Sequence, residues 1–162
     1  MTTVRDALTA YLTLNGFTTD AYTAPTVAIP IGPVTIPLPN TAGRKAVVKL
    51  HDLHHLATGY GTDLTGEAEI GAWELRAGCT TVAAYVYNAM AVAMGMVISP
   101  RRTLRAFADA RGSTTLYRVG LGYEQTLDLT MSELRARMHL PASGLAREPV
   151  KLHSAAPRLA ST

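Results

Sequence analysis

The chain has 162 residues, of which 48% are hydrophobic and 17% are charged, and its net charge is +3. This length supports one domain with a single core, and this composition excludes an intrinsically disordered chain. The net charge is small and no segment is a basic run, so we expect no nucleic-acid partner. The single cysteine, Cys79, excludes a disulfide framework and a Cys-rich zinc site.

The first residues predict a helix and no targeting segment. Apolar side chains recur at helical spacing over residues 3–15, Thr3 and Asp6 have the spacing of a capping box, and Gly16 marks the end. Because Arg5 and Asp6 interrupt any apolar run, we expect neither a signal peptide nor a transit peptide. We therefore expect a cytoplasmic protein.

Residues 17–42 predict an apolar arm without a helix. Proline lacks the amide donor that a helix requires, and this segment contains prolines at positions 25, 30, 33, 37 and 39. Two alternatives remain for the arm, an extended loop and a frayed hairpin.

Helical spacing returns over residues 43–58, and a Gly-Tyr-Gly turn at residues 59–61 ends this helix. Asp63 is placed to cap a second helix over residues 64–77, which ends at Gly78. The two helices are thus expected to be joined by a tight turn.

Residues 77–100 contain no charged residue, and the Ala- and Met-rich stretch 82–98 has a length that permits a membrane span. Its many small residues, together with Tyr85, Tyr87 and Asn88, which require partners, favour a buried central helix. A transmembrane helix is the alternative.

Ser99 and Pro100 predict the start of another helix, which ends at Gly112. Residues 113–129 contain two more glycines and predict a loop with a short strand at most.

Thr130 and Glu133 form a second capping box, which opens a short helix to about Met138. The chain is then rich in proline and small residues, which predicts a mobile tail over residues 141–162. The sequence therefore predicts a mainly α domain over residues 1–140, with about five helices, a central apolar helix and a proline-rich arm.

Three of the five histidines and five of the twelve acidic residues lie between residues 51 and 74. On a helix, His51, Asp52 and His55 share an arc of about 100°, so the two imidazoles can converge on one ion. His54 points away from His55. Glu67 follows the turn, so a second helix can fold back and contribute its carboxylate.

Two imidazoles with one or two carboxylates suit zinc, and equally iron(II) in a two-His, one-carboxylate site. Glu74, on the same helical face as Glu67, is a candidate to support the ligands from behind. A simpler interpretation is a His-x-x-x-His pair without a metal. The spacing also fits the H-E-x-x-H motif of metalloproteases, but the shorter Asp52 in place of glutamate disfavours a peptidase.

The same residues resemble a known family. His51-Asp52-Leu53-His54-His55, then eleven residues and Glu67, are similar to the H-D-x-x-H-x(11)-E signature of the Coq four family of ubiquinone (coenzyme Q) biosynthesis proteins. Residues 58–67, Thr-Gly-Tyr-Gly-Thr-Asp-Leu-Thr-Gly-Glu, also resemble that family. The close similarity covers residues 46–78, and a looser similarity in helix order covers residues 5–140.

The resemblance implies a helical protein that binds a divalent metal, usually zinc, and lies peripherally on a membrane. It implies that His51, Asp52, His55 and Glu67 are the metal ligands and catalytic residues. It also implies an enzyme that replaces the ring carboxylate of a prenylated hydroxybenzoate by a hydroxyl. The position of His54 is commonly tryptophan in the family, and the short chain indicates a bacterial relative, in ubiquinone synthesis or in another aromatic pathway.

Three functions follow from these observations. The first, which we favour, is oxidative decarboxylation of a prenylated aromatic acid with zinc, iron or manganese, in which the apolar helix and the arm form a slot for the substrate. The second is a prenyl-lipid carrier or scaffold of a quinone-biosynthesis complex, in peripheral contact with the inner face of the membrane. The third is a structural metal that joins two helices. The metal, the substrate and the oligomeric state, including a homo-oligomer, stay open.

Two further groups have alternative interpretations. The methionines at positions 90, 94 and 96 suit a slot for an apolar ligand, but ordinary core packing is favoured. The basic residues at positions 44, 45 and 49 are expected on a solvated helix face, with contact to a carboxylate or to anionic headgroups as the alternative.

Overall fold

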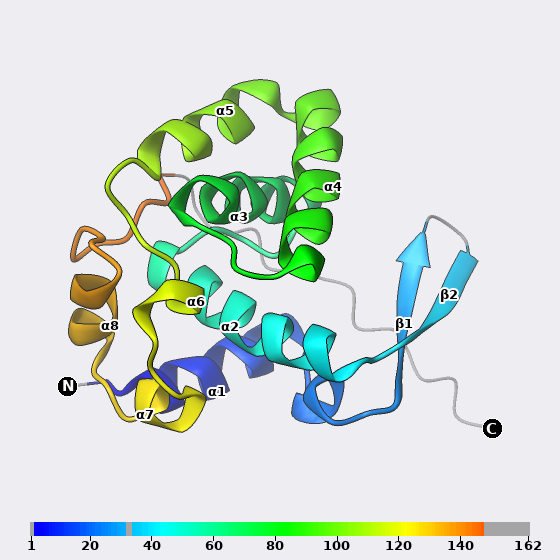
Figure 1. The fold of residues 1–162 in the computed structure, drawn as a ribbon, viewed down its shortest axis with the longest axis horizontal. Coiled ribbons are helices and arrows are strands. Elements are labelled where there is room, and N and C mark those ends of the chain that lie inside the picture. Colours follow the sequence, from blue (N-terminus) through cyan, green and yellow to red (C-terminus); the bar gives the residue numbers. More distant parts are fainter. Residues whose placement is uncertain (1, 32–33, 148–162) are drawn as a thin grey trace.

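The computed structural model describes residues 2–31 and 34–147, and Figure 1 shows how their elements are arranged. The longer helices are α1 (Val4–Asn15), α2 (Ala42–Thr58), α3 (Leu64–Ala77), α4 (Val82–Ile98) and α5 (Pro100–Asp109). The shorter elements are the 3-10 helix η1 (Thr19–Tyr22), the strands β1 (Thr26–Ile31) and β2 (Val34–Pro39), and the helices α6 (Leu116–Val119), α7 (Tyr123–Leu127) and α8 (Met131–Arg137). The expected mainly α architecture is confirmed.

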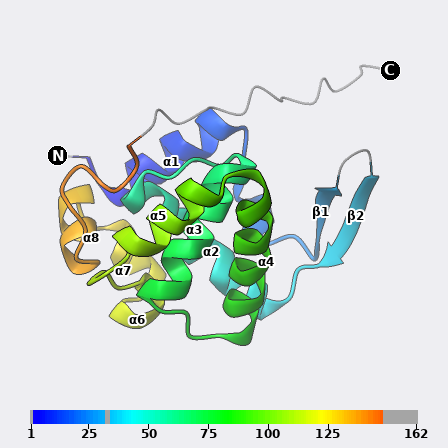
Figure 2. The same ribbon diagram turned by 90° about the horizontal axis from the view of Figure 1, so that it is seen from above.

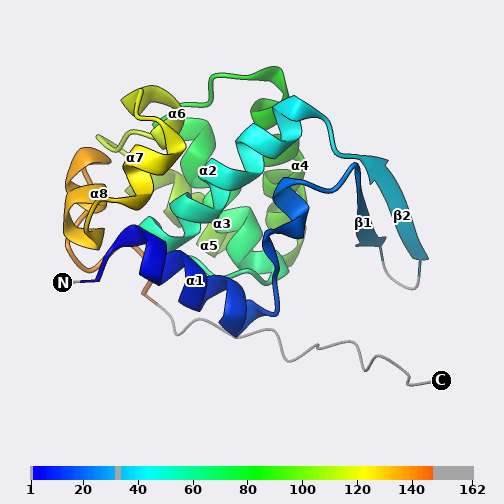
Figure 3. The ribbon, with the colours of Figure 1, turned by 90° about the horizontal axis from the view of Figure 1, so that it is seen from below.

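Helix α3 lies at the centre of the body. Figure 1 shows α5 above α3, α4 beside it, and α2 with α1 below it, and Figures 2 and 3 show the same elements from above and from below. Most side chains of α3 are buried, Ile70 and Trp73 completely, and the main core extends from them to Val4, Leu53 and Leu134. This packing sets α2 against α3, which brings their polar residues together.

Most of the capping residues expected from the sequence define the helix ends, but Ser99 at the start of α5 makes no side-chain capping bond. Thr3 and Asp6 form the capping box of α1, and Gly16 ends that helix with a φ of 67°. At the start of α3 the Asp63 carboxylate accepts a hydrogen bond from the Gly66 amide at 2.8 Å. The first amides of a helix have no partner within the helix, so these side chains fix where it begins.

Helix α4 is not buried on all sides, and that expectation is wrong. Only Ala84, Asn88 and Gly95 are buried, whereas Val82 and Val97 are 80% and 83% exposed. The helix packs on α3 and α5 with one side, and its uniformly apolar sequence has no polar face that would reveal the outward side. Among the residues that the structure describes, no helix is long and apolar enough to cross a membrane.

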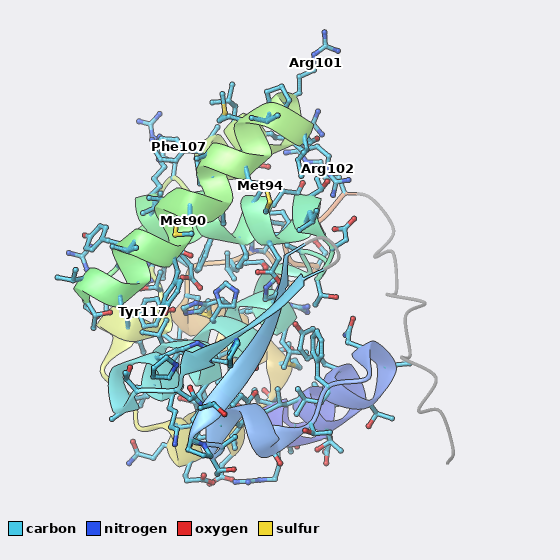
Figure 4. All side chains as sticks on the ribbon, turned by 90° about the vertical axis from the view of Figure 1, so that its right-hand side faces the viewer. Met90, Met94, Arg101, Arg102, Phe107 and Tyr117 are labelled. Atoms are coloured by element: carbon cyan, nitrogen blue, oxygen red, sulfur yellow. The ribbon has the colours of Figure 1, made fainter. Side chains whose placement is uncertain are left out.

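The methionines of α4 follow the same pattern. Met90 and Met96 are exposed, so core packing is the wrong expectation for both, and Met94 is half-buried. Figure 4 shows this side of the molecule, with Met90 and Met94 on the helix that faces the viewer.

Residues 113–129 form two short helices, α6 and α7, instead of the expected loop with a short strand. Helices of four and five residues are too short to display a hydrophobic period. Long-range contacts hold α6 in place, because the Leu116 amide donates a hydrogen bond to the His54 ring at 2.9 Å.

The proline-rich arm is an antiparallel hairpin of β1 and β2, in which Ile29 lies opposite Ile36 and Pro30 opposite Thr35. Each strand of a two-stranded sheet has a free edge, which tolerates proline. Figure 1 shows the hairpin projecting from the body between η1 and α2. The hairpin alternative is confirmed.

Residues 141–147 are packed on the body and do not belong to a free tail. The Leu145 and Ala146 amides both donate to the Thr58 carbonyl, at 2.7 and 3.0 Å, and Arg147 forms an ion pair with Asp109 at 3.2 Å. The last carbonyls of a helix lack partners within it, so this segment completes the end of α2. The expected boundary at residue 141 is too early, and residues 148–162 lie outside the described residues.

We expect Gly66→Ala to lower the free energy of unfolding by about 1–3 kcal/mol, because overpacked positions force the backbone to shift. A Cβ at Gly66 would lie 2.0 Å from the Gly61 carbonyl oxygen. The control is Gly43→Ala, at a helical glycine with nothing within 4 Å, which should stabilise by about 0.5 kcal/mol. Urea unfolding measures the stability of both variants. Equal changes in the free energy of unfolding for Gly66→Ala and Gly43→Ala would contradict the close packing at the turn.

Candidate metal centre

Helices α2 and α3 contribute the residues of the site from facing sides. His51, His54 and His55 lie on α2, and Glu67 and Glu74 lie on α3. The turn between the helices begins at Gly59, whose φ of 82° is a conformation that favours glycine. The chain therefore reverses within a few residues, and Glu67 is returned to the histidine pair.

His51, His55 and Glu67 form one cluster whose ligand atoms all lie within 4.8 Å of one another. The two Nε2 atoms are 3.2 Å apart, and the Glu67 carboxylate oxygens lie 3.3 Å from His51 Nε2 and 3.4 Å from His55 Nε2. Two nitrogens bound to one tetrahedral zinc ion at about 2.0–2.1 Å would lie about 3.3 Å apart. The spacing of the three side chains thus fits a divalent ion.

Each imidazole is fixed through its Nδ1 atom. His55 Nδ1 donates to the Tyr60 carbonyl at 3.1 Å, and His51 Nδ1 donates to the Glu74 carboxylate at 2.8 Å. When a ring is neutral and its Nδ1 atom carries the proton, its Nε2 atom has a free lone pair. In both histidines this lone pair is directed into the cluster. Metal-binding histidines are oriented in this way by carboxylates and carbonyls behind them.

The cluster is buried at one end and accessible at the other. The His55 side chain is 1% exposed, whereas those of His51 and Glu67 are 21% and 37% exposed. A structural zinc site is usually closed by four protein ligands, whereas a catalytic site keeps a position open. The three-residue set with an accessible side therefore fits a site that admits a small ligand.

Asp52, the fourth residue expected as a ligand, is not part of this cluster. Its carboxylate accepts a hydrogen bond from the Tyr22 hydroxyl of η1. Burial raises the pKa of Asp52, while the Tyr22 hydrogen bond and the two ring charges of His51 and His55 oppose that shift. The structure therefore places three of the four predicted residues together.

Replacing Asp52 by asparagine distinguishes a supporting residue from a ligand. If the Tyr22 contact is its main role, zinc affinity should fall by no more than about 10–100-fold, the loss typical of residues behind the ligands. A competition titration against a chromogenic chelator measures this. A loss as large as that caused by His55→Ala would make Asp52 a ligand.

Glu74 is the buried anchor behind the cluster. Its Oε1 atom accepts hydrogen bonds from His51 and His54, at 2.8 and 2.7 Å, and its Oε2 atom accepts from Asn88 and Tyr117, at 2.6 and 3.1 Å. Burial alone would raise the pKa of Glu74, but the histidines outweigh it and hold this pKa well below its usual range. The Glu74 side chain is therefore ionised, and each of its two oxygens accepts two hydrogen bonds. This is expected for a residue that orients His51.

His54 is a core residue and not a metal ligand. Its Nδ1 atom donates to Glu74 and its Nε2 atom accepts from the Leu116 amide, so neither nitrogen is available. The ring is fully buried against Trp73 and Tyr117. Burial lowers the pKa of His54. Its neutral ring packs in the core as an aromatic side chain would.

The carboxylates around His51 favour the protonated form of its ring. Burial would lower the pKa of His51, but the Glu74 charge and the hydrogen bonds to Glu67 and Glu74 raise it well above its ordinary value. A metal ion needs the neutral ring. Zinc affinity should therefore rise with pH through the neutral range, with about one proton released for each ion bound. Calorimetry in buffers of different ionisation enthalpy measures this release, and binding without it would contradict the protonated state.

No protein-family model, curated protein or solved structure matches this chain.

Sequence reasoning missed three contributors to the site. Tyr22 and Tyr117 come from segments far along the chain from the motif, and no local pattern marks them. Asn88 does have a signal, because it is a carboxamide in a helix that is otherwise uncharged and largely apolar. A buried amide requires a partner, and that partner is Glu74.

Proposed function

We propose that this chain is a metal-dependent enzyme that replaces the carboxyl group of a prenylated hydroxybenzoate-type ring by a hydroxyl. The observation that carries the proposal is the cluster of His51, His55 and Glu67, which has the spacing of a metal site and one accessible side. The similarity to the Coq four signature supports the choice of reaction. The substrate class comes from that similarity.

The residues divide into ligands and supports. His51, His55 and Glu67 would hold zinc, iron or manganese, whose charge polarises a carboxylate or activates oxygen or water. Glu74 and the Tyr60 carbonyl keep the two imidazoles in the required tautomer. The reaction releases carbon dioxide and adds one oxygen atom to the ring, so it is a two-electron oxidation. We propose dioxygen as the oxidant, with one dioxygen consumed for two substrate molecules, so that each ring receives one oxygen atom and each loses its carboxyl group as carbon dioxide.

The test is a turnover assay with the protein loaded separately with each of the three metals. A prenylated 4-hydroxybenzoate is supplied with ¹⁸O-labelled dioxygen, and the products are followed by mass spectrometry. We expect carbon dioxide and a ring hydroxyl from the parent protein, and loss of both with Glu67→Gln. Glu124→Gln, at an exposed carboxylate paired with Arg5, is the matched control. Folded, metal-loaded protein without turnover would overturn the proposal.

The exposed apolar face of α4 favours a second candidate, a non-catalytic carrier or scaffold for prenyl lipids. Val82, Val86, Met90 and Val97 are exposed on this helix, and patches of this kind often mark contacts with lipids or proteins. This candidate includes peripheral contact with the inner face of a membrane. It predicts that the protein sediments with phospholipid vesicles containing a prenyl lipid, and that Glu67→Ala leaves this binding unchanged. Loss of lipid together with the metal would count against it.

A further inference from the structure

A cavity of about 420 Å³ lies on a different side of α2 from the histidine cluster. Lys49 and His51 are two positions apart, which corresponds to about 200° around a helix, so their side chains leave the helix on opposite sides. Ala46 and Leu50 of α2 form the apolar floor of the cavity, and Leu121 forms the facing wall. This hollow therefore lies on the side of α2 away from the histidine cluster, and Tyr22, which lines it, also donates a hydrogen bond to Asp52.

Two lysines stand at this cavity. The Lys49 ammonium lies 5.8 and 5.1 Å from the ring centroids of Tyr22 and Tyr123, which also line the cavity. Among residues 2–31 and 34–147, Lys49 forms no ion pair with a carboxylate. Lys45 donates a hydrogen bond to the Thr23 carbonyl at 2.8 Å, and within the part of the chain that the structure describes it forms no ion pair with a carboxylate either.

The hollow continues along the helix. A second cavity, also of about 420 Å³, shares Ala46, Leu50 and Leu121 with the first and extends toward Thr81. The combined surface is an elongated apolar groove with positive charge at one end. An elongated ligand with one anionic head complements both features, because the charge lies beside the groove and the walls are hydrocarbon.

We propose that this groove binds a chain-like carboxylate, with its head at Lys49 and Lys45 and its hydrocarbon body along Ala46, Leu50 and Leu121. The site is independent of the metal and of the reaction proposed above. Binding satisfies the charge of Lys49 and covers apolar surface that α2 leaves open. Both effects favour an apolar anion over a neutral or cationic molecule of the same length.

The test is a calorimetric titration with decanoate, below its micelle concentration, of both chelator-treated and zinc-loaded protein. We expect one decanoate per chain with equal affinity in both forms. Lys49→Gln should weaken binding at least tenfold, and Lys49→Arg should restore most of it. Arg101→Gln, at an exposed cation on α5 (Figure 4), is the control and should leave binding unchanged. Decanol should bind more weakly than decanoate.

Lysine acylation provides a second readout, because the chain has only three lysines, Lys45, Lys49 and Lys151. Decanoate should protect Lys45 and Lys49 from acylation. No binding at millimolar decanoate would overturn the proposal. Binding that requires zinc, is lost with His51→Ala and is indifferent to Lys49→Gln would also overturn it, since the carboxylate would then lie at the metal.

Discussion

Glu74→Ala should lower the free energy of unfolding of the metal-free protein by about 3–5 kcal/mol, the loss typical of breaking a buried charge pair. The carboxylate is completely buried, and four side chains donate hydrogen bonds to it: His51, His54, Asn88 and Tyr117. Truncation leaves His51 and the other three donors without this acceptor. The cost is therefore the desolvation of several groups and not the loss of one contact.

Urea unfolding in the presence of a chelator measures this prediction without interference from metal binding. The control is Glu124→Ala, which removes an exposed carboxylate paired with Arg5 and should change stability by less than about 0.5 kcal/mol. A second variant, Glu74→Gln, keeps the shape of the side chain and should cost less than Glu74→Ala. A loss below about 1 kcal/mol for Glu74→Ala would mean that the charge is not the centre of the network.

His55→Ala should lower the affinity for zinc by more than about 100-fold, because the loss of a direct ligand exceeds the losses of 10–100-fold found for residues behind the ligands. His55 is the least exposed member of the cluster, and its Nδ1 atom is already bonded to the Tyr60 carbonyl. His54 cannot substitute for its Nε2 atom, since both nitrogens of His54 are engaged.

The matched control for this prediction is another histidine of the chain. His139 is exposed and has a φ of 56°, so asparagine is the replacement that tolerates its backbone. His139→Asn should leave zinc affinity unchanged within about threefold, an interval of roughly 0.6 kcal/mol. Competition with a chelator of known affinity measures both variants. A similar affinity for His55→Ala and the parent would remove His55 from the site.

The helix ends were predictable because short-range chemistry sets them. Thr3, Asp63 and Thr130 satisfy amides within the next turn, and Gly16 and Gly59 permit the backbone to leave the helix. Such contacts depend only on neighbours in the sequence. For the same reason the sequence could predict two helices joined by a tight turn. That arrangement brings Glu67 close to His51 and His55.

The other features of the fold and of the site depend on tertiary contacts, which the spacing of residues in the sequence does not indicate. Helix α4 is apolar all round, so its sequence could not indicate that one side faces outward. Asp52 shares the arc of the histidines on α2, but the position of Tyr22 decides where its carboxylate points. The role of Glu74 as an anchor could be expected from its position on α3, whereas Tyr117 and Asn88 reach it from elements that only the tertiary fold brings together.

The central claim is that His51, His55 and Glu67 bind a divalent metal. Elemental analysis of protein purified without chelators, beside the double variant His51→Ala/His55→Ala, tests it most directly. We predict about one zinc, iron or manganese ion per chain in the parent protein and almost none in the variant. Absence of metal from both proteins, even after metal is added, would contradict the claim.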